Sequence, residues 1–233
     1  MSRNLIFGLN KVSAIILAAG SGRRFGEKKQ FKRLNGRPVW TYSLNTFIGS
    51  NCFTEFILVV SEEFLNDLKD SKEFYRFSKT TNIKLVCGGE LRQDSVYSGL
   101  KLVDENNNII CIHDAARPFV KQKHIRDVVG ACSDFDGSIL AIPATDTIKK
   151  IQDGIIEKTI DRDSIWLAQT PQAFQKDKLL HAIELGSNIK ITDESTLMEI
   201  AGLKIKIIRG DSSNLKITRK IDWELAKIIE SEK

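Results

Sequence analysis

Short apolar runs rich in β-branched residues alternate along this chain with longer segments whose apolar residues recur at helical spacing. The short runs predict strands at residues 12–17, 56–60, 83–86, 109–112, 138–142, 166–169 and 204–208. The longer segments predict helices at residues 38–47, 62–77 (capped by Ser61), 91–103, 123–132, 176–185, 194–201 and 221–230. Such alternation is typical of an α/β fold in which helices cover both faces of a mostly parallel sheet.

Residues 147–162 break this alternation and predict a hairpin of two strands. Gln152, Asp153 and Gly154 stand at its centre, and Asp-Gly between two strand-like runs is a hairpin signal. So polar a hairpin buries little against its own domain. It is either a protruding arm that another subunit completes or a solvated surface hairpin.

Length and composition fit one domain that spans residues 1–233. The chain is 42% hydrophobic, and its net charge of +5 comes from 35 basic and 30 acidic residues that are interspersed. This mild charge suits a phosphate-rich small substrate as well as nucleic acid, and we expect the small substrate. No apolar run approaches the roughly 18 residues of a membrane span, so we expect no membrane partner. Without a recognisable signal peptide and with four widely spaced, reduced cysteines, the expected location is cytoplasmic.

The first predicted strand leads straight into a loop of small residues, Ala18, Ala19, Gly20, Ser21 and Gly22. Small side chains let backbone N–H groups face a ligand, and consecutive amides bind anions. Long cationic side chains follow at Arg23, Arg24, Lys28 and Lys29. The pattern predicts a phosphate site. It lacks the G-x-x-x-x-G-K-[ST] of a Walker loop, and its G-x-G-x-x-x-G spacing weakens the dinucleotide interpretation.

A second polar string, HDAARP at residues 113–118, follows another buried strand. Its side chains are expected at a carboxyl end of the sheet, where open α/β sheets bind ligands. Mg²⁺ takes one or two carboxylates together with phosphate oxygens and water, so Asp114 is a candidate ligand. A helix cap is the alternative role for this aspartate.

The run AIILAAGSGRRFG at residues 14–26, followed by KQF at 29–31, resembles the signature of the 2-C-methyl-D-erythritol 4-phosphate cytidylyltransferase family. HDAARP, TPQAF at 170–174, TDE at 192–194 and NLKITR at 214–219 are similar to further family strings. Matching segments extend from Ala14 to about Ala226. The resemblance implies a Rossmann-like fold of the nucleotide-diphospho-sugar transferase type, CTP and a polyol phosphate as substrates, Mg²⁺ as cofactor, and a homodimer formed through the arm.

The resemblance also assigns roles to residues. The catalytic residues it implies are Arg24, Lys29 and Lys216, and the metal ligand is Asp114. It implies nucleotide binding by Ala18, Ala19, Gly20, Ser21, Gly22, Gly89, Glu90, Ser95 and Ala115. It implies substrate binding by Arg117, Thr147, Arg162 and Thr170, with Thr147 and Arg162 reaching a neighbouring subunit. The family usually has proline, lysine and glutamine where this chain has Lys28, Lys29 and Gln30. Lys29 keeps the position before glutamine, and Lys28 is its rival.

The function implied is cytidylyl transfer from CTP to 2-C-methyl-D-erythritol 4-phosphate, with release of pyrophosphate, in the non-mevalonate route to isoprenoid precursors. Two alternatives stay open. One is cytidylyl transfer to ribitol 5-phosphate, because enzymes of that kind share the loop and the arm. The other is a nucleotide-binding module without catalytic activity.

Overall fold

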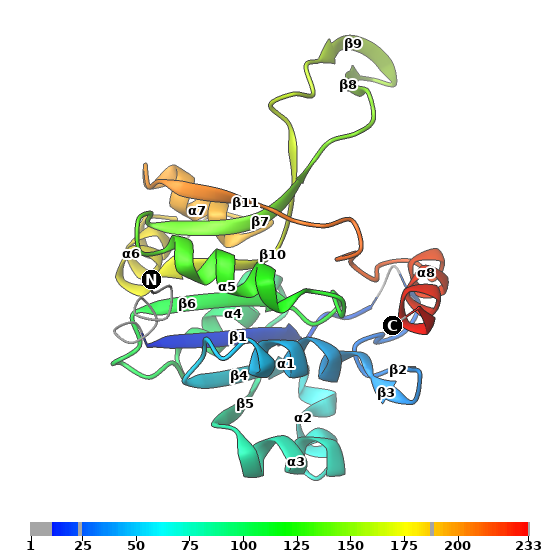
Figure 1. Ribbon diagram of the computed structural model, residues 1–233. Helices are drawn as coiled ribbons and strands as arrows, with labels where there is room; N and C mark the ends of the chain where they lie inside the picture. The colour runs from blue at the N-terminus through cyan, green and yellow to red at the C-terminus, as the bar shows by residue number, and fades with distance from the viewer. Residues whose placement is uncertain (1–10, 23–24, 187–188, 233) are drawn as a thin grey trace, which may run out of the picture.

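The computed structural model describes residues 11–22, 25–186 and 189–232 and is organised around one seven-stranded sheet (Figure 1). The strand order is β11-β7-β10-β6-β1-β4-β5. Their bounds are β1 Val12–Ala18, β4 Glu55–Val60, β5 Ile83–Cys87, β6 Ile109–Asp114, β7 Gly137–Pro143, β10 Trp166–Gln175 and β11 Ile205–Arg209. Only β10 runs antiparallel to its neighbours in this sheet. The predicted mostly parallel α/β sheet is confirmed.

Helices pack on both faces of this sheet, as its alternating side chains require. Along β1, Ala14 and Ile16 belong to one apolar core, and Ile15 and Leu17 belong to the other. The first core is closed by α1 Val39–Gly49, α2 Glu62–Lys69, α3 Lys72–Thr80 and α5 Gln122–Ala131. The second is closed by α4 Arg92–Leu100, α6 Lys176–Leu185 and α7 Glu194–Ile200. Every residue of β1 is buried, which explains its mostly apolar sequence.

A third, smaller core lies beyond the carboxyl end of β1. It joins α8 Lys220–Ser231 to a short hairpin of β2 Arg33–Leu34 and β3 Arg37–Pro38 (Figure 1). Phe25 and Trp223 meet there edge to face, with ring centroids 5.9 Å apart. The sequence prediction missed this hairpin, although its Asn35-Gly36 turn is a hairpin signal. This core fastens the C-terminal helix to the segment that follows the glycine-rich loop.

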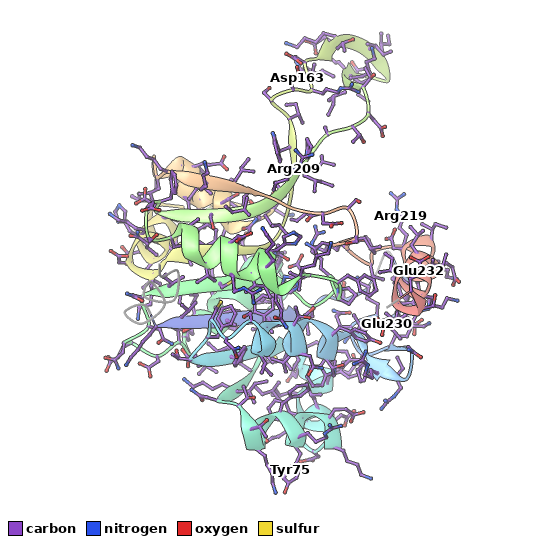
Figure 2. All side chains as sticks on the ribbon, viewed as in Figure 1. Tyr75, Asp163, Arg209, Arg219, Glu230 and Glu232 are labelled. Atoms are coloured by element: carbon purple, nitrogen blue, oxygen red, sulfur yellow. The ribbon has the colours of Figure 1, made fainter. Side chains whose placement is uncertain are left out.

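The predicted hairpin at residues 147–162 is present as β8 Ile148–Gln152 and β9 Ile155–Ile160. Asp153 and Gly154 have φ angles of 49° and 80°, as a type I′ turn requires. The hairpin projects from the sheet (Figure 1), and Asp163 beside it stands farther out than Arg209 at the end of β11 (Figure 2). Ile155 is 73% exposed at its tip. We call residues 147–162 the arm.

The single helix predicted at residues 62–77 is wrong. α2 ends at Lys69, and α3 begins after Ser71, whose Oγ accepts a hydrogen bond from the backbone N–H of Phe74 at 3.1 Å. Ser61 makes no such cap for α2; its Oγ accepts from the ammonium of Lys28 at 3.2 Å instead. A serine that caps a new helix therefore interrupts the apolar spacing on which the prediction relied.

The strand predicted to stop at residue 169 continues to Gln175. A proline such as Pro171 disfavours a continued strand, because it has no N–H to donate to the ladder. The pairing of β10 with β7 shifts register between Ala168 and Gln172, so the proline falls in the irregular part of the ladder. Within the described part of the chain, no helix is both long enough and apolar enough to cross a membrane.

The cap at Ser71 can be tested against Ser61, which begins a helix without a capping bond. We expect Ser71→Ala to lower the free energy of unfolding by about 1 kcal/mol, the usual cost of losing an N-cap. Ser61→Ala should change it by less than about 0.5 kcal/mol. Urea denaturation of the full chain measures both, and equal losses would contradict the cap assignment.

Candidate active site

A cavity of about 670 Å³ lies where β1, β4, β5 and β6 end. Parallel strands bring their carboxyl ends to one edge, which is where open α/β sheets bind ligands. The loops after these strands and the segment before α8 form its wall. The lining residues are Leu17, Ala19, Gly20, Ser21, Gly22, Lys28, Lys29, Gln30, Ser61, Gly89, Glu90, Leu91, Arg92, Ser95, Asp114, Ala116 and Lys216.

The glycine-rich loop at residues 18–22 is held by the side chain of Gln30. Its Nε2 donates to the carbonyl oxygens of Ala18 at 3.1 Å and Gly20 at 2.7 Å. Gly22 has a φ of 70°, and a Cβ there would lie 2.0 Å from the carbonyl oxygen of Glu27, so only glycine fits. With its carbonyls tied in this way, the loop has the fixed peptide orientation that an anion cradle needs.

Asp114, the last residue of β6, lies between two cations. Its Oδ1 accepts from Nε of Arg92 at 3.2 Å, and its Oδ2 binds Nζ of Lys216 at 2.6 Å. Nη1 of Arg92 donates in turn to both carboxylate oxygens of Glu194, each at 2.8 Å. Positive and negative charges therefore alternate from Lys216 to Glu194. We call these four side chains the charge row.

The charge row keeps Asp114 ionised. Burial raises the pKa of this carboxyl, but attraction to Arg92 and Lys216 outweighs burial and holds the pKa far below its usual range. Burial also lowers the pKa of Arg92, and attraction to Asp114 and Glu194 more than reverses that effect. At neutral pH the cavity therefore presents a fixed carboxylate between two fixed cations.

Behind Asp114, a buried hydrogen-bonded chain joins β6 to β10. The backbone N–H of Asp114 donates to Oγ1 of Thr170 at 3.1 Å, and this hydroxyl lies 3.1 Å from Nδ1 of His113. Nε2 of His113 lies 3.1 Å from the carbonyl oxygen of Arg117. Burial lowers the pKa of His113 to about 4, so the imidazole is neutral, accepting at one nitrogen and donating at the other.

Lys216 reaches Asp114 because its segment is bound to the end of the sheet. Nδ2 of Asn214 donates to Oε1 of Gln169 at 3.1 Å and to the carbonyl of Thr170 at 3.0 Å. The carbonyl of Asn214 accepts from Nη1 of Arg117 at 2.8 Å. These bonds bring a residue near the C-terminus to a carboxylate in the middle of the chain.

The cavity gathers most of the residues singled out from the sequence. Those that line it are Ala19, Gly20, Ser21, Gly22, Lys29, Gly89, Glu90, Ser95, Asp114 and Lys216. Ala18 and Ala115 are buried in the apolar core beneath it. Arg117 and Thr170 stand behind the lining, where they bind the Asn214 carbonyl and the Asp114 backbone.

Thr147 and Arg162 lie apart from this cavity, at the base of the arm. Both are exposed, and Nη1 of Arg162 donates to the carbonyl of Thr145 at 2.5 Å. Neither lines the cavity of its own chain. Arg24 lies outside the described residues.

Arg92 is a candidate site residue that the sequence reasoning missed. The helix after Gly89 was predicted, and Arg92 stands in its first turn three positions before Ser95, so both face the same side. That spacing was the available signal. Of the two rival lysines, Lys28 is bound to Ser61 and Glu63, whereas the side chain of Lys29 is buried against the cavity.

A mostly parallel sheet with a glycine-rich loop and a cation-lined cavity at its carboxyl edge places this chain in the α/β nucleotidyltransferase class. The family model for IspD, 2-C-methyl-D-erythritol 4-phosphate cytidylyltransferase, matches residues 12–232. The chain belongs to this family.

Relatives and solved structures agree with this membership. The 2-C-methyl-D-erythritol 4-phosphate cytidylyltransferase of Bacillus licheniformis is 38% identical over 94% of this chain and 96% of its own length. The protein of the same name from Aquifex aeolicus is 39% identical over 93% and 96%. The crystal structure of 4-diphosphocytidyl-2C-methyl-D-erythritol synthase from Anaerococcus prevotii has a TM-score of 0.86 at 32% identity, covering 98% of this chain and 99% of that one.

The buried end of the charge row can be tested with two glutamates. Glu194→Ala leaves Arg92 without its bidentate partner, and we expect it to lower the free energy of unfolding by about 3–5 kcal/mol. Glu224 pairs with Lys227 on the surface of α8, and Glu224→Ala should cost no more than about 1 kcal/mol. Urea denaturation compares the two, and similar losses would show that the charge row contributes no more than a surface pair.

Proposed function

We propose that this chain transfers a cytidylyl group from CTP to 2-C-methyl-D-erythritol 4-phosphate and releases pyrophosphate. Family membership supports the reaction. The observation that links the reaction to this site is the carboxylate of Asp114, which is held between Arg92 and Lys216 in the cavity that the glycine-rich loop also lines. We infer a cytoplasmic enzyme, in keeping with four cysteines that are all free thiols.

The reaction needs no general base. The second pKa of a phosphate monoester is about 6, so the attacking oxygen of the acceptor is already largely deprotonated at neutral pH. The barrier comes from bringing one anion to another. Catalysis then depends on in-line positioning and on cations that neutralise the charge developing at the α-phosphorus. We assign that neutralisation to Arg24 and Lys29, and the reception of the acceptor's phosphate to Lys216.

At the part of the cavity that we assign to the nucleotide, small residues let the backbone come close to a ligand. The backbone N–H of Gly89 donates to Oγ of Ser95 at 3.2 Å. A Cβ on Gly88 would lie 2.6 Å from both the Ala19 side chain and that hydroxyl. We propose that Gly89, Glu90 and Ser95 hold the cytosine and ribose, with the triphosphate on the loop of residues 19–22.

Asp114 fits a Mg²⁺ ion that arrives with the triphosphate. Among the described residues, no group of three or more His, Cys, Asp or Glu side chains is placed to hold a metal. One carboxylate suffices when phosphate oxygens and water complete the shell. Both oxygens of Asp114 carry a cationic partner, so metal binding would release one of them, and Lys216 is the more exposed. The ion would neutralise negative charge on the phosphate oxygens.

The arm is assigned to the acceptor site of a second subunit. Thr147 and Arg162 are remote from the cavity of their own chain, and the exposed Ile151, Ile155 and Ile156 give the arm an apolar surface to bury. We propose a homodimer in which Arg162 of each chain binds the methylerythritol phosphate in the cavity of the other.

The function is tested by pyrophosphate release from CTP with each acceptor. We expect turnover with 2-C-methyl-D-erythritol 4-phosphate and little with ribitol 5-phosphate. Arg24→Ala should lower kcat by at least about 10²-fold, the effect of losing one charge-stabilising donor. Preference for ribitol 5-phosphate would move the chain to that alternative. Silence with both acceptors, despite CTP binding, would favour a module without catalysis.

The trans role of the arm is tested by mixing two variants that each have very low activity. Arg162→Ala removes the proposed substrate contact of the arm and leaves the cavity intact. Lys29→Ala removes the proposed catalytic lysine of the cavity and leaves the arm intact. A mixed dimer then contains one intact site, so random exchange should restore about a quarter of the wild-type activity. Sedimentation of the wild-type chain should show a dimer. A monomer, or a mixture that stays at that low activity after exchange, would overturn the trans assignment.

A further inference from the structure

Lys28 stands where the family pattern has a proline, and its side chain is bound to the start of α2. Its ammonium donates to Oγ of Ser61 at 3.2 Å and to the carboxylate of Glu63. The same ammonium lies 5.1 Å from the ring centroid of Phe64. A hydroxyl, a carboxylate and an aromatic face thus hold this cation at one helix terminus.

Phe31 binds the other end of the same short segment to the same helix. Its ring stacks on Phe64 with centroids 3.9 Å apart and an interplanar angle of 5°. The backbone N–H of Phe31 donates to the carbonyl of Lys28 at 3.1 Å, which closes a turn. Both outer residues of the turn therefore contact one aromatic ring.

The two inner residues of this turn serve the cavity. The side chain of Lys29 is buried against it, and Gln30 holds the carbonyls of Ala18 and Gly20. Residues 28–31 thus connect α2 on one side with the glycine-rich loop on the other. Any shift of the turn on α2 would move Lys29 and the loop together.

Two roles are open to Lys28, because it also lines the cavity. It could bind the triphosphate directly, or it could hold the turn. Direct binding would require the ammonium to leave Glu63, Ser61 and the Phe64 ring. Direct binding would therefore give up three contacts at once, all of them to residues at the start of α2.

We propose that Lys28 is a positioning residue which, through Glu63, holds the turn on α2 and thereby fixes Lys29 in the cavity. A proline at this position restricts φ by its own ring. A lysine has no such restriction, but here its ammonium ties the turn to Ser61, Glu63 and Phe64. The proposal rests on the catalytic role of Lys29 given above.

The test compares Lys28→Met, Glu63→Gln and the double variant in the full chain. Pyrophosphate release gives kcat, and calorimetry gives the affinity for CTP without any need for turnover. We expect each single variant to lower kcat about tenfold while the Kd for CTP stays within about twofold, because misplaced catalytic groups cost rate more than binding. The double variant should be no slower than either single one. Lys28→Arg, which keeps the pair with Glu63, should recover most of the rate.

Action through Lys29 has its own readout. In a Lys29→Ala background, followed through its residual turnover at high enzyme concentration, Lys28→Met should lower kcat by clearly less than tenfold, because the main group it positions is gone. A further tenfold loss would overturn the proposal. Lys123→Met, which removes an exposed pair with Asp127 on α5, is the control and should equal wild type.

A ligand role for Lys28 gives the opposite result. Lys28→Met would then weaken CTP binding about tenfold or more, and Glu63→Gln, by freeing the ammonium, would leave binding unchanged or tighten it. That result overturns the positioning role, as does wild-type kcat in both single variants. Absence of turnover in the wild-type chain would count against the proposed function instead, while the calorimetric comparison of the variants would still decide the role of Lys28.

Discussion

The charge of Asp114 is the constraint on which the rest of this site depends. A carboxylate that is 10% exposed has lost most of its hydration, and its pKa would rise if no cation met it. Arg92 comes from the first turn of α4, and Lys216 comes from the segment before α8. Keeping one strand-end aspartate ionised therefore requires the sheet, helix α4 and the segment before α8 to meet at one point.

The architecture around the sheet supplies that meeting point. β10 runs antiparallel between β6 and β7, so its N-terminal half lies beside the carboxyl end of β6 and places Thr170 next to Asp114. Asn214 binds Thr170 and Gln169, and the third apolar core fixes α8 beyond it. The one reversed strand and the last helix thus allow Lys216 to reach Asp114.

The sequence predicted the parts of the site that follow directly from strand ends. The glycine-rich loop and Asp114 each lie at the carboxyl end of a buried strand, so chain order alone placed them at one edge of the sheet. The sequence did not single out Arg92, because it is identified by its ion pairs with Asp114 and Glu194, which are distant in sequence. The break between α2 and α3 was missed for a local reason: the cap at Ser71 overrides an apolar spacing that continues past it. The hairpin of the arm was predictable because Asp153-Gly154 favours its turn through local backbone preferences alone.

The proposed triphosphate site needs its cations in place before the anion arrives, and this chain gives those cations, and the lysine that supports the neighbouring turn, internal partners. Arg92 and Lys216 share Asp114, Arg92 also has Glu194, and Lys28 has Glu63. These carboxylates offset mutual repulsion and fix each cation in place, so little reorganisation is left for the moment of reaction. The cations differ in how easily a ligand can displace their partners. Lys216 is the most exposed of the three and shares its aspartate, which suits exchange with an incoming ligand, whereas Lys28 is bound to a helix terminus, which suits a fixed support.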